Sequence, residues 1–286
     1  MALRLAPAVL LALGTASPAA AGDAVARGAY LAAAAGCEGC HTDPKGSGKP
    51  YAGGRSLDTA FGSIATPNIT PDIATGIGGW SMDDFTRAMR WGIAPDGSHY
   101  VPAFPFPYFA GLTDGDLADL KAFLDSVPPV SRPAAGPSPL ALVQRARAAL
   151  GVALASPPSP PAALGSDPAA ARGAYLVETV GHCGGCHTPL TWLGAPDEER
   201  HLAGSHGGVE GEKAPNITPD AATGIGRWSA DEIATTLKTG ETPEFDVLGG
   251  AMREIVRNAA RLTDDDRRAI AAYLKTVPAK SFADKE

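Results

Sequence analysis

The sequence predicts an all-α protein made of two tandem, similar domains that are joined by a proline-rich linker. Three observations support this prediction: a long internal repeat, helix-start signals at matching places in both copies, and weak strand patterning throughout. The chain has 34 glycines and 26 prolines, well above average usage, so loops must occupy much of each domain. With 44% hydrophobic and 19% charged residues, the composition is that of a folded chain and excludes wholesale disorder.

Five motifs occur twice and in the same order. The first copies begin at residues 26 (ARGAYL), 36 (GCEGCHT), 67 (PNITPD), 74 (ATGIGGWS) and 112 (LTD), and the second copies begin at residues 171, 182, 215, 222 and 262. The spacing between copies grows from 145 to 150 residues, which indicates one duplicated domain with small loop insertions. We therefore expect domains at residues 22–127 and 168–286. Prolines clustered near both ends of residues 128–167 mark this segment as an extended, semi-rigid linker.

Each domain is predicted to hold three helices. The first helix carries ARGAYL and stops at a glycine next to the cysteine motif. The second follows a Trp-Ser pair, whose serine can cap the helix and precedes acidic residues that favour a helix N-terminus. The third begins at a threonine with an aspartate three residues later, a spacing that resembles a capping box. The stop and start residues are Gly36, Ser81 and Thr113 in the first domain and Gly181, Ser229 and Thr263 in the second.

The first 21 residues are predicted to be a secretory signal peptide. Arg4 provides a positive charge, an apolar run follows from Leu5 to Leu13, and three alanines end at Ala21 as a cleavage site. The mature chain is therefore expected in the periplasm. No later segment reaches 18 apolar residues, so we expect no transmembrane segment in the mature chain. The net charge of −7 argues against nucleic acid as a partner.

All four cysteines lie in two copies of the motif Cys-x-x-Cys-His. This motif is typical of c-type haem attachment, because two thiols on one turn can form thioethers with the two vinyl groups of one porphyrin while the adjacent histidine binds the iron. At this composition one accidental match is expected only about 10⁻³ times. The sequence therefore predicts two covalently bound haem c groups. The attachment residues are Cys37, Cys40, Cys183 and Cys186, and the iron ligands are His41 and His187.

Other uses of such cysteines explain the pattern less well. A structural zinc site would leave the histidine after each pair without a reason. A thioredoxin-like redox pair expects a βαβ context, which the sequence lacks. Disulfides within such short loops would not require the histidine either. These comparisons leave haem attachment as the interpretation of both motifs.

The motifs together resemble a known family. CxxCH, PNITPDxATGIGxWS and the closing LTDxD helix are similar to those of the cytochrome c subunits of periplasmic quinoprotein alcohol dehydrogenases and flavin gluconate or sorbitol dehydrogenases. The resemblance covers about residues 24–278 apart from the linker. It implies two class I cytochrome c-like domains that pass single electrons from a periplasmic dehydrogenase to an oxidase or another cytochrome of a respiratory chain, without a catalytic residue of their own. Those subunits often carry three haems, whereas this chain has two attachment motifs.

The sixth iron ligand differs between the copies. In this family a methionine usually lies opposite the histidine, and Met252 in the second copy is the predicted ligand. It lies 36 residues after Asn216, whereas the residue 36 after Asn68 is Phe104, which cannot bind iron. Three alternatives remain for the first haem: an open iron beneath Phe104, ligation by His99, or ligation by Met89.

This asymmetry has two functional consequences. A methionine ligand raises the redox potential, so electrons are expected to enter at the first haem and leave by the second. An open first iron also keeps an enzyme as the alternative reading, with peroxidase-like chemistry or oxidation of a sulfur compound at that haem. Residues suited to hold haem propionates are Arg55, Asn68, Trp80, Asn216 and Trp228. The histidines expected at the surface are His182, His201 and His206.

Overall fold

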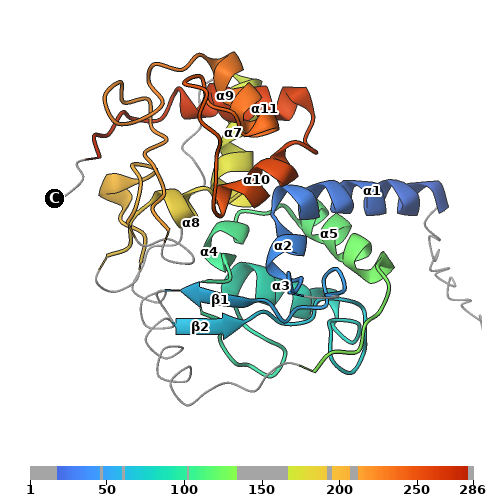
Figure 1. Cartoon of the computed structure of the whole chain (residues 1–286). Helices are drawn as coiled ribbons and strands as arrows, with labels where there is room; N and C mark the ends of the chain where they lie inside the picture. Colours follow the sequence, from blue (N-terminus) through green and yellow to red (C-terminus); the bar gives the residue numbers. More distant parts are fainter. Residues whose placement is uncertain are drawn as a thin grey trace, which may run out of the picture.

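The computed structural model describes residues 18–45, 48–59, 62–101, 103–133, 167–191, 195–206 and 212–282. Over this part the chain is mainly helical and forms two halves that follow one another in sequence (Figure 1). Most of the predicted signal peptide and residues 134–166 of the predicted linker lie outside the described residues. Within the described residues no helix is both long and apolar enough to cross a membrane.

The first half contains the three predicted helices and three short elements that were not predicted. The additions are the helical turns α2 and α4 and a two-stranded antiparallel sheet, in which Ser56 pairs with Ala65. Strands of four residues are too short to leave a clear alternating pattern. The elements are α1 (Pro18–Ala34), α2 (Cys37–Cys40), β1 (Ser56–Thr59), β2 (Gly62–Ala65), α3 (Met82–Trp91), α4 (Phe106–Phe109) and α5 (Asp114–Ser126).

The second half repeats this order with local changes. Its first helix continues as a π-helical stretch, η1, and α10 is a helix in addition to the three predicted for this half. Val256 and Ala259, buried at helical spacing, explain why this segment is helical. The elements are α7 (Pro168–Ala174), η1 (Tyr175–Val180), α8 (Gly184–His187), η2 (Glu198–Arg200), α9 (Ala230–Thr239), α10 (Met252–Ala259) and α11 (Asp264–Leu274).

The predicted helix caps are confirmed. Ser81 forms a full capping box with Asp84, because its side chain accepts the Asp84 N–H and its own N–H reaches the Asp84 carboxylate. Ser229 and Glu232 do the same at the start of α9. The side chains of Thr113 and Thr263 accept from the N–H groups of Asp116 and Asp266, respectively.

Two glycines bring the first and last helices of each half into close contact. An added Cβ would lie 1.9 Å from the carbonyl oxygen of Asp119 at Gly28, and 1.9 Å from that of Ala269 at Gly173. These glycines lie at the same place in the two ARGAYL motifs. The repeated motif therefore places backbone against backbone where α1 crosses α5 and where α7 crosses α11. Apolar residues of both halves form one contiguous core.

Candidate functional site

The first cysteine motif forms a single helical turn. Gly36 enters it with φ 68°, a conformation that suits glycine, and the His41 N–H closes the turn on the Cys37 carbonyl oxygen at 3.0 Å. None of the four cysteines, all of which the structure describes, is in a disulfide. Burial raises the pKa of Cys37 to about 12, so a neutral sulfur is favoured there. A thioether is neutral, whereas a zinc ligand would have to be a thiolate.

The backbone of the PNITPD motif orients His41. Its Nδ1 lies 2.8 Å from the carbonyl oxygen of Pro67. Because a carbonyl oxygen can only accept, Nδ1 carries the ring proton and Nε2 is the nitrogen with the lone pair. Burial lowers the pKa of His41, which keeps the ring in the neutral form that binds a metal.

The second motif repeats this geometry. Cys183 caps the turn α8, and the His187 N–H reaches the Cys183 carbonyl oxygen at 2.9 Å. His187 is buried and its Nδ1 lies 2.7 Å from the carbonyl oxygen of Pro215. Burial raises the pKa of Cys183 to about 12 and lowers the pKa of His187. The structure therefore brings each predicted cysteine pair and its histidine together, and both proline carbonyls join these sites.

These groups fit haem c better than a bare metal ion. Each site offers two cysteine sulfurs on one turn and one oriented imidazole, which is the donor set that a covalently attached haem needs. Among the described residues, no group of three or more His, Cys, Asp or Glu side chains is arranged to hold a metal ion. The zinc alternative is therefore not supported by the fold.

The residues expected to hold propionates have other partners. Asn68 donates from Nδ2 to Val130 O at 2.7 Å and to Thr75 Oγ1 at 3.0 Å, and Asn216 makes the equivalent pair of bonds. Both amides therefore fasten loops, which corrects the expectation for these two residues. The Trp228 indole N–H donates to Glu244 at 3.0 Å, and Arg55 forms an ion pair with Glu254 of the other half at 2.8 Å.

The candidate sixth ligands lie in different surroundings. Met252 is the half-buried first residue of α10. Met89 is buried in the core on α3, whereas His99 is exposed and pairs through its backbone with Ile93. Phe104 packs in an aromatic cluster with ring centroids 5.6 Å from Tyr100, 6.4 Å from Phe106 and 5.8 Å from Phe109.

Matching contacts align the two segments that hold these residues. The Tyr100 N–H bonds Gly92 O at 2.7 Å, and the Leu248 N–H bonds Gly240 O at 2.8 Å. Further along, Phe106 lies against Gly92 and Val256 lies against Gly240. Five residues separate the aligned positions in the first half and seven in the second. Met252 therefore belongs to a segment that is two residues longer than its counterpart, which contains no methionine.

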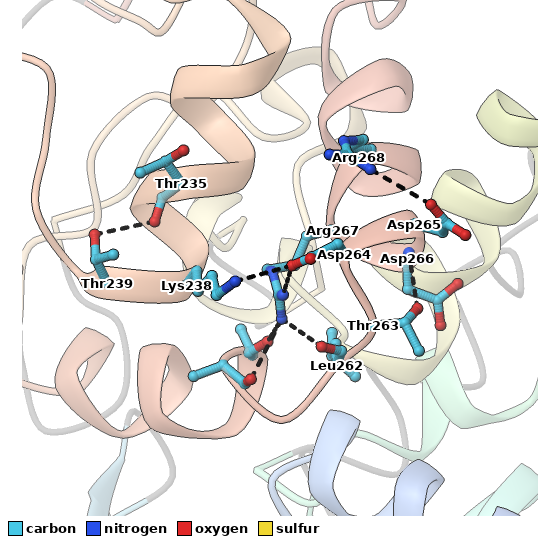
Figure 2. A network of polar contacts seen from close by, with 12 residues as sticks. Thr235, Lys238, Thr239, Leu262, Thr263, Asp264, Asp265, Asp266, Arg267 and Arg268 are labelled. Atoms are coloured by element: carbon cyan, nitrogen blue, oxygen red, sulfur yellow. Dashed lines mark hydrogen bonds and ion pairs between the residues drawn. The ribbon is translucent and has the colours of Figure 1, made fainter.

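A buried arginine holds the other end of α10 (Figure 2). Arg267 is 3% exposed, and its Nη1 donates to the carbonyl oxygens of Ala259 at 2.9 Å and of Leu262. Ala259 is the last residue of α10 and Leu262 follows it, so Arg267 binds carbonyl oxygens at the C-terminal end of this helix. Asp264 accepts from both Arg267 and Lys238. Arg267 thus fixes the helix that begins with Met252. Sequence reasoning missed it, because arginine in the last helix reads as a surface residue.

The second half contains a polar network whose aligned positions in the first half are apolar. Glu178 accepts hydrogen bonds from the Tyr273 hydroxyl at 2.6 Å and from His201 Nε2 at 2.9 Å. The repeat aligns Glu178 with Ala33 and Tyr273 with Phe123, which are apolar. His201 is thus half-buried in a network, which corrects its expected place at the surface.

Each cysteine motif also touches the other half. A Cβ on Gly39 would overlap the Glu254 carboxylate of α10, and a Cβ on Gly184 would lie 3.1 Å from the Tyr108 hydroxyl of α4. His182, next to Cys183, packs against the ring of Phe109. The expectation that His182 lies at the surface is therefore wrong, because α4 covers it. The two candidate sites face a common interface.

A comparison with protein families settles the fold family. The cytochrome c family model matches residues 25–128 and matches again at residues 170–278. The chain belongs to the cytochrome c family. The two matches confirm tandem cytochrome c domains, and membership of the family supports haem c as the cofactor of this cytochrome.

Relatives with curated names agree with this assignment. The cytochrome is 46% identical over 258 residues to a "Diheme cytochrome c-type" protein of Cereibacter sphaeroides, with 88% of this chain and 86% of the relative covered. It is 40% identical to the "Gluconate 2-dehydrogenase cytochrome c subunit" of Pantoea cypripedii (94% and 64% covered) and 39% identical to the "Alcohol dehydrogenase (quinone), cytochrome c subunit" of Gluconobacter oxydans (89% and 55% covered). The chain thus spans 64% of the length of the gluconate dehydrogenase subunit and 55% of the length of the alcohol dehydrogenase subunit.

Proposed function

We propose that this cytochrome is a periplasmic carrier of single electrons with two haem c groups, one in each half. The observation that carries the proposal is the repeated geometry of the motifs, in which a Cys-x-x-Cys turn is followed by a histidine whose Nδ1 is bonded to a proline carbonyl. Such a hydrogen bond fixes the tautomer and the plane of a ligand histidine. The same arrangement in both copies supports the same role for both.

The proposal gives each residue of the sites a task. Cys37 and Cys40 attach the first haem, and His41 binds its iron. The corresponding residues in the second half are Cys183, Cys186 and His187, with Met252 as the sixth ligand. When bound, each haem supplies a one-electron couple. The chain orients the histidines through the carbonyl oxygens of Pro67 and Pro215.

The donor is proposed to be a periplasmic dehydrogenase, and the acceptor an oxidase or another cytochrome of a respiratory chain. The support for the donor is the likeness to subunits whose names assign them to gluconate, alcohol and fructose dehydrogenases. Export requires that residues 1–21 act as a signal peptide, and residues 128–167 are proposed to link the domains. The carrier itself then needs no catalytic residue.

The experiment that tests this function measures the mass and the spectrum of the exported protein. We expect the mature chain plus two haems, and a reduced spectrum typical of c-type cytochromes. A Cys37→Ser/Cys40→Ser variant should retain one covalent haem, and so should a Cys183→Ser/Cys186→Ser variant. A colourless protein with the mass of the bare chain would disprove the proposal.

An enzyme remains the second candidate, because Phe104 occupies the segment in which the other half has its methionine. In that case the first haem would react with peroxide or a sulfur compound, and the second would relay electrons. Steady-state assays with peroxide and thiosulfate distinguish the two functions. Turnover by the isolated protein that is lost in His41→Ala would favour the enzyme, and no turnover favours the carrier.

A further inference from the structure

His182 has a positive φ angle, and the residue at the same position of the first half is a glycine. Its φ is 40°, and the aligned residue of the first half is Gly36 with φ 68°. L-residues with side chains are rarely found in this region, and such strain is retained only where the surroundings compensate for it. The position directly precedes Cys183, so any compensating contact also acts on the second attachment turn.

The compensating contacts come from the first half. The His182 ring meets the Phe109 ring edge-on, with centroids 5.5 Å apart, and lies 6.4 Å from the Tyr108 ring. Its Nε2 is 3.3 Å from the carbonyl oxygen of Ala35. Since that oxygen accepts, Nε2 carries the proton. Burial lowers the pKa of His182, so the ring is neutral.

These contacts join the two attachment turns through one side chain. Ala35 lies two residues before Cys37, and His182 lies one residue before Cys183. The first half makes no equivalent contact from this position, because Gly36 has no side chain. A Cβ there would meet only Asn258, at 3.5 Å. The ion pair of Arg55 with Glu254, by contrast, reaches α10 of the second half and not its attachment turn.

We propose that His182 is a positioning residue that holds the two Cys-x-x-Cys-His turns at a fixed separation and thereby sets the rate of electron transfer between the halves. The part that concerns electron transfer rests on the proposed function. Electron tunnelling falls steeply with distance, so a small shift of one turn against the other changes the rate far more than it changes the environment of either iron.

The test compares His182→Gly, His182→Gln and the control His206→Ala. Glycine relieves the backbone strain and removes the ring, whereas glutamine keeps an N–H donor of similar reach. His206 stacks on Phe282 in the second half. Three quantities are measured: hydrogen exchange of the α4 amides, both midpoint potentials, and the rate at which a photo-injected electron redistributes between the haems.

We expect His182→Gly to slow redistribution by about tenfold or more, with both potentials unchanged and faster exchange at α4. His182→Gln should recover most of the rate, and His206→Ala should match the unsubstituted protein. Unchanged redistribution in His182→Gly would overturn the proposal, and so would a slower rate explained by a shifted potential. Unchanged exchange at α4 would overturn the positioning role whether or not the protein holds haem, whereas absence of haem from the unsubstituted protein would refute the proposed function instead.

Discussion

Tyr30 of the first half donates its hydroxyl hydrogen to Asp266 of the second half over 2.6 Å, and the same hydroxyl accepts the Thr263 N–H at 3.0 Å. The reverse contact exists as well. Tyr175 bonds Asp116, and its hydroxyl accepts the Thr113 N–H at 3.3 Å. Each tyrosine of an ARGAYL motif thus contacts the first turn of the last helix of the other half, so the two repeats contact one another reciprocally.

Removing one of these hydroxyls should weaken the contact between the halves. In Tyr30→Phe the ring remains, but Asp266 and Thr263 lose a half-buried hydrogen-bond partner. We expect a loss of about 1.5–3 kcal/mol in the free energy of unfolding, because the lost bond is to a charged acceptor. Denaturant titration measures this. Tyr51→Phe, whose ring packs edge-on against Phe123 within the first half, is the control, and an equal loss there would show that the Tyr30 hydroxyl has no particular importance for the contact between the halves.

Asp266 should make the stability sensitive to acid. Hydrogen bonds from Arg172 hold the pKa of Asp266 below its ordinary value, although burial opposes them. A carboxylate with a lowered folded pKa contributes stability above its unfolded pKa of about 3.9, and this contribution is lost as pH falls through the folded pKa. Asp266→Asn should therefore differ most from the unsubstituted protein at neutral pH and least in acid.

The control for this prediction is Asp265→Asn, because the Asp265 side chain is 96% exposed and makes only a surface ion pair. Urea unfolding of all three proteins between neutral pH and the acid limit provides the comparison. A constant gap between Asp266→Asn and the unsubstituted protein at every pH would contradict the linkage.

The glycines at the helix crossings should not tolerate a side chain. Gly28→Ala places a Cβ against the Asp119 carbonyl, which is backbone and must move together with α5. We expect a cost of about 1–3 kcal/mol or more in the free energy of unfolding, as for other overpacked sites. Gly115→Ala on α5 has only a contact at 3.9 Å and should be neutral or slightly stabilising. Equal effects of the two substitutions would show that the helices adjust freely.

The charge of Glu178 should lower the potential of the second haem. Glu178 is 14% exposed, accepts from Tyr273 and His201, and raises the pKa of Cys183 through its charge in addition to burial. A nearby negative charge favours the oxidised iron, so Glu178→Gln should raise that potential and leave the first haem unchanged. Glu198→Gln, whose side chain is 75% exposed, is the matched control. Spectroelectrochemical titration measures both midpoint potentials. Equal shifts of the potential at both haems would contradict a local effect of Glu178.

The parts of this structure that were predictable are local in sequence. Cys37, Cys40 and His41 are adjacent, and the caps at Ser81 and Ser229 act within one turn. The partners that complete the sites come from elsewhere: the Pro67 carbonyl reaches His41 from 26 residues away. The periodicity of apolar residues in the sequence predicts neither which backbone carbonyl a side chain will contact nor which residues of the two domains will touch. The two misplaced histidines, His182 and His201, show the same limit, because only their contacts with distant residues take them partly out of solvent.

Carbon monoxide should bind one of the two reduced haems and leave the other unchanged. The segment from Tyr100 to Phe106 contains no methionine, Met89 is buried in the core, and His99 is exposed on a turn held by its backbone. We therefore expect the first iron to accept the gas beneath Phe104, and the second to refuse it because Met252 is its proposed sixth ligand. Optical titration of the reduced protein gives the number of sites.

Substitutions then assign each site. Met252→Ala should open the second iron, doubling the uptake and lowering the potential of that haem, because a thioether ligand raises the potential. Refusal of carbon monoxide by the unsubstituted protein would contradict an open first iron. In that event His99→Ala and Met89→Leu identify the ligand, because only the variant that lacks it gains uptake. A first haem that proves more oxidising than the second would reverse the expected direction of electron flow through the two halves.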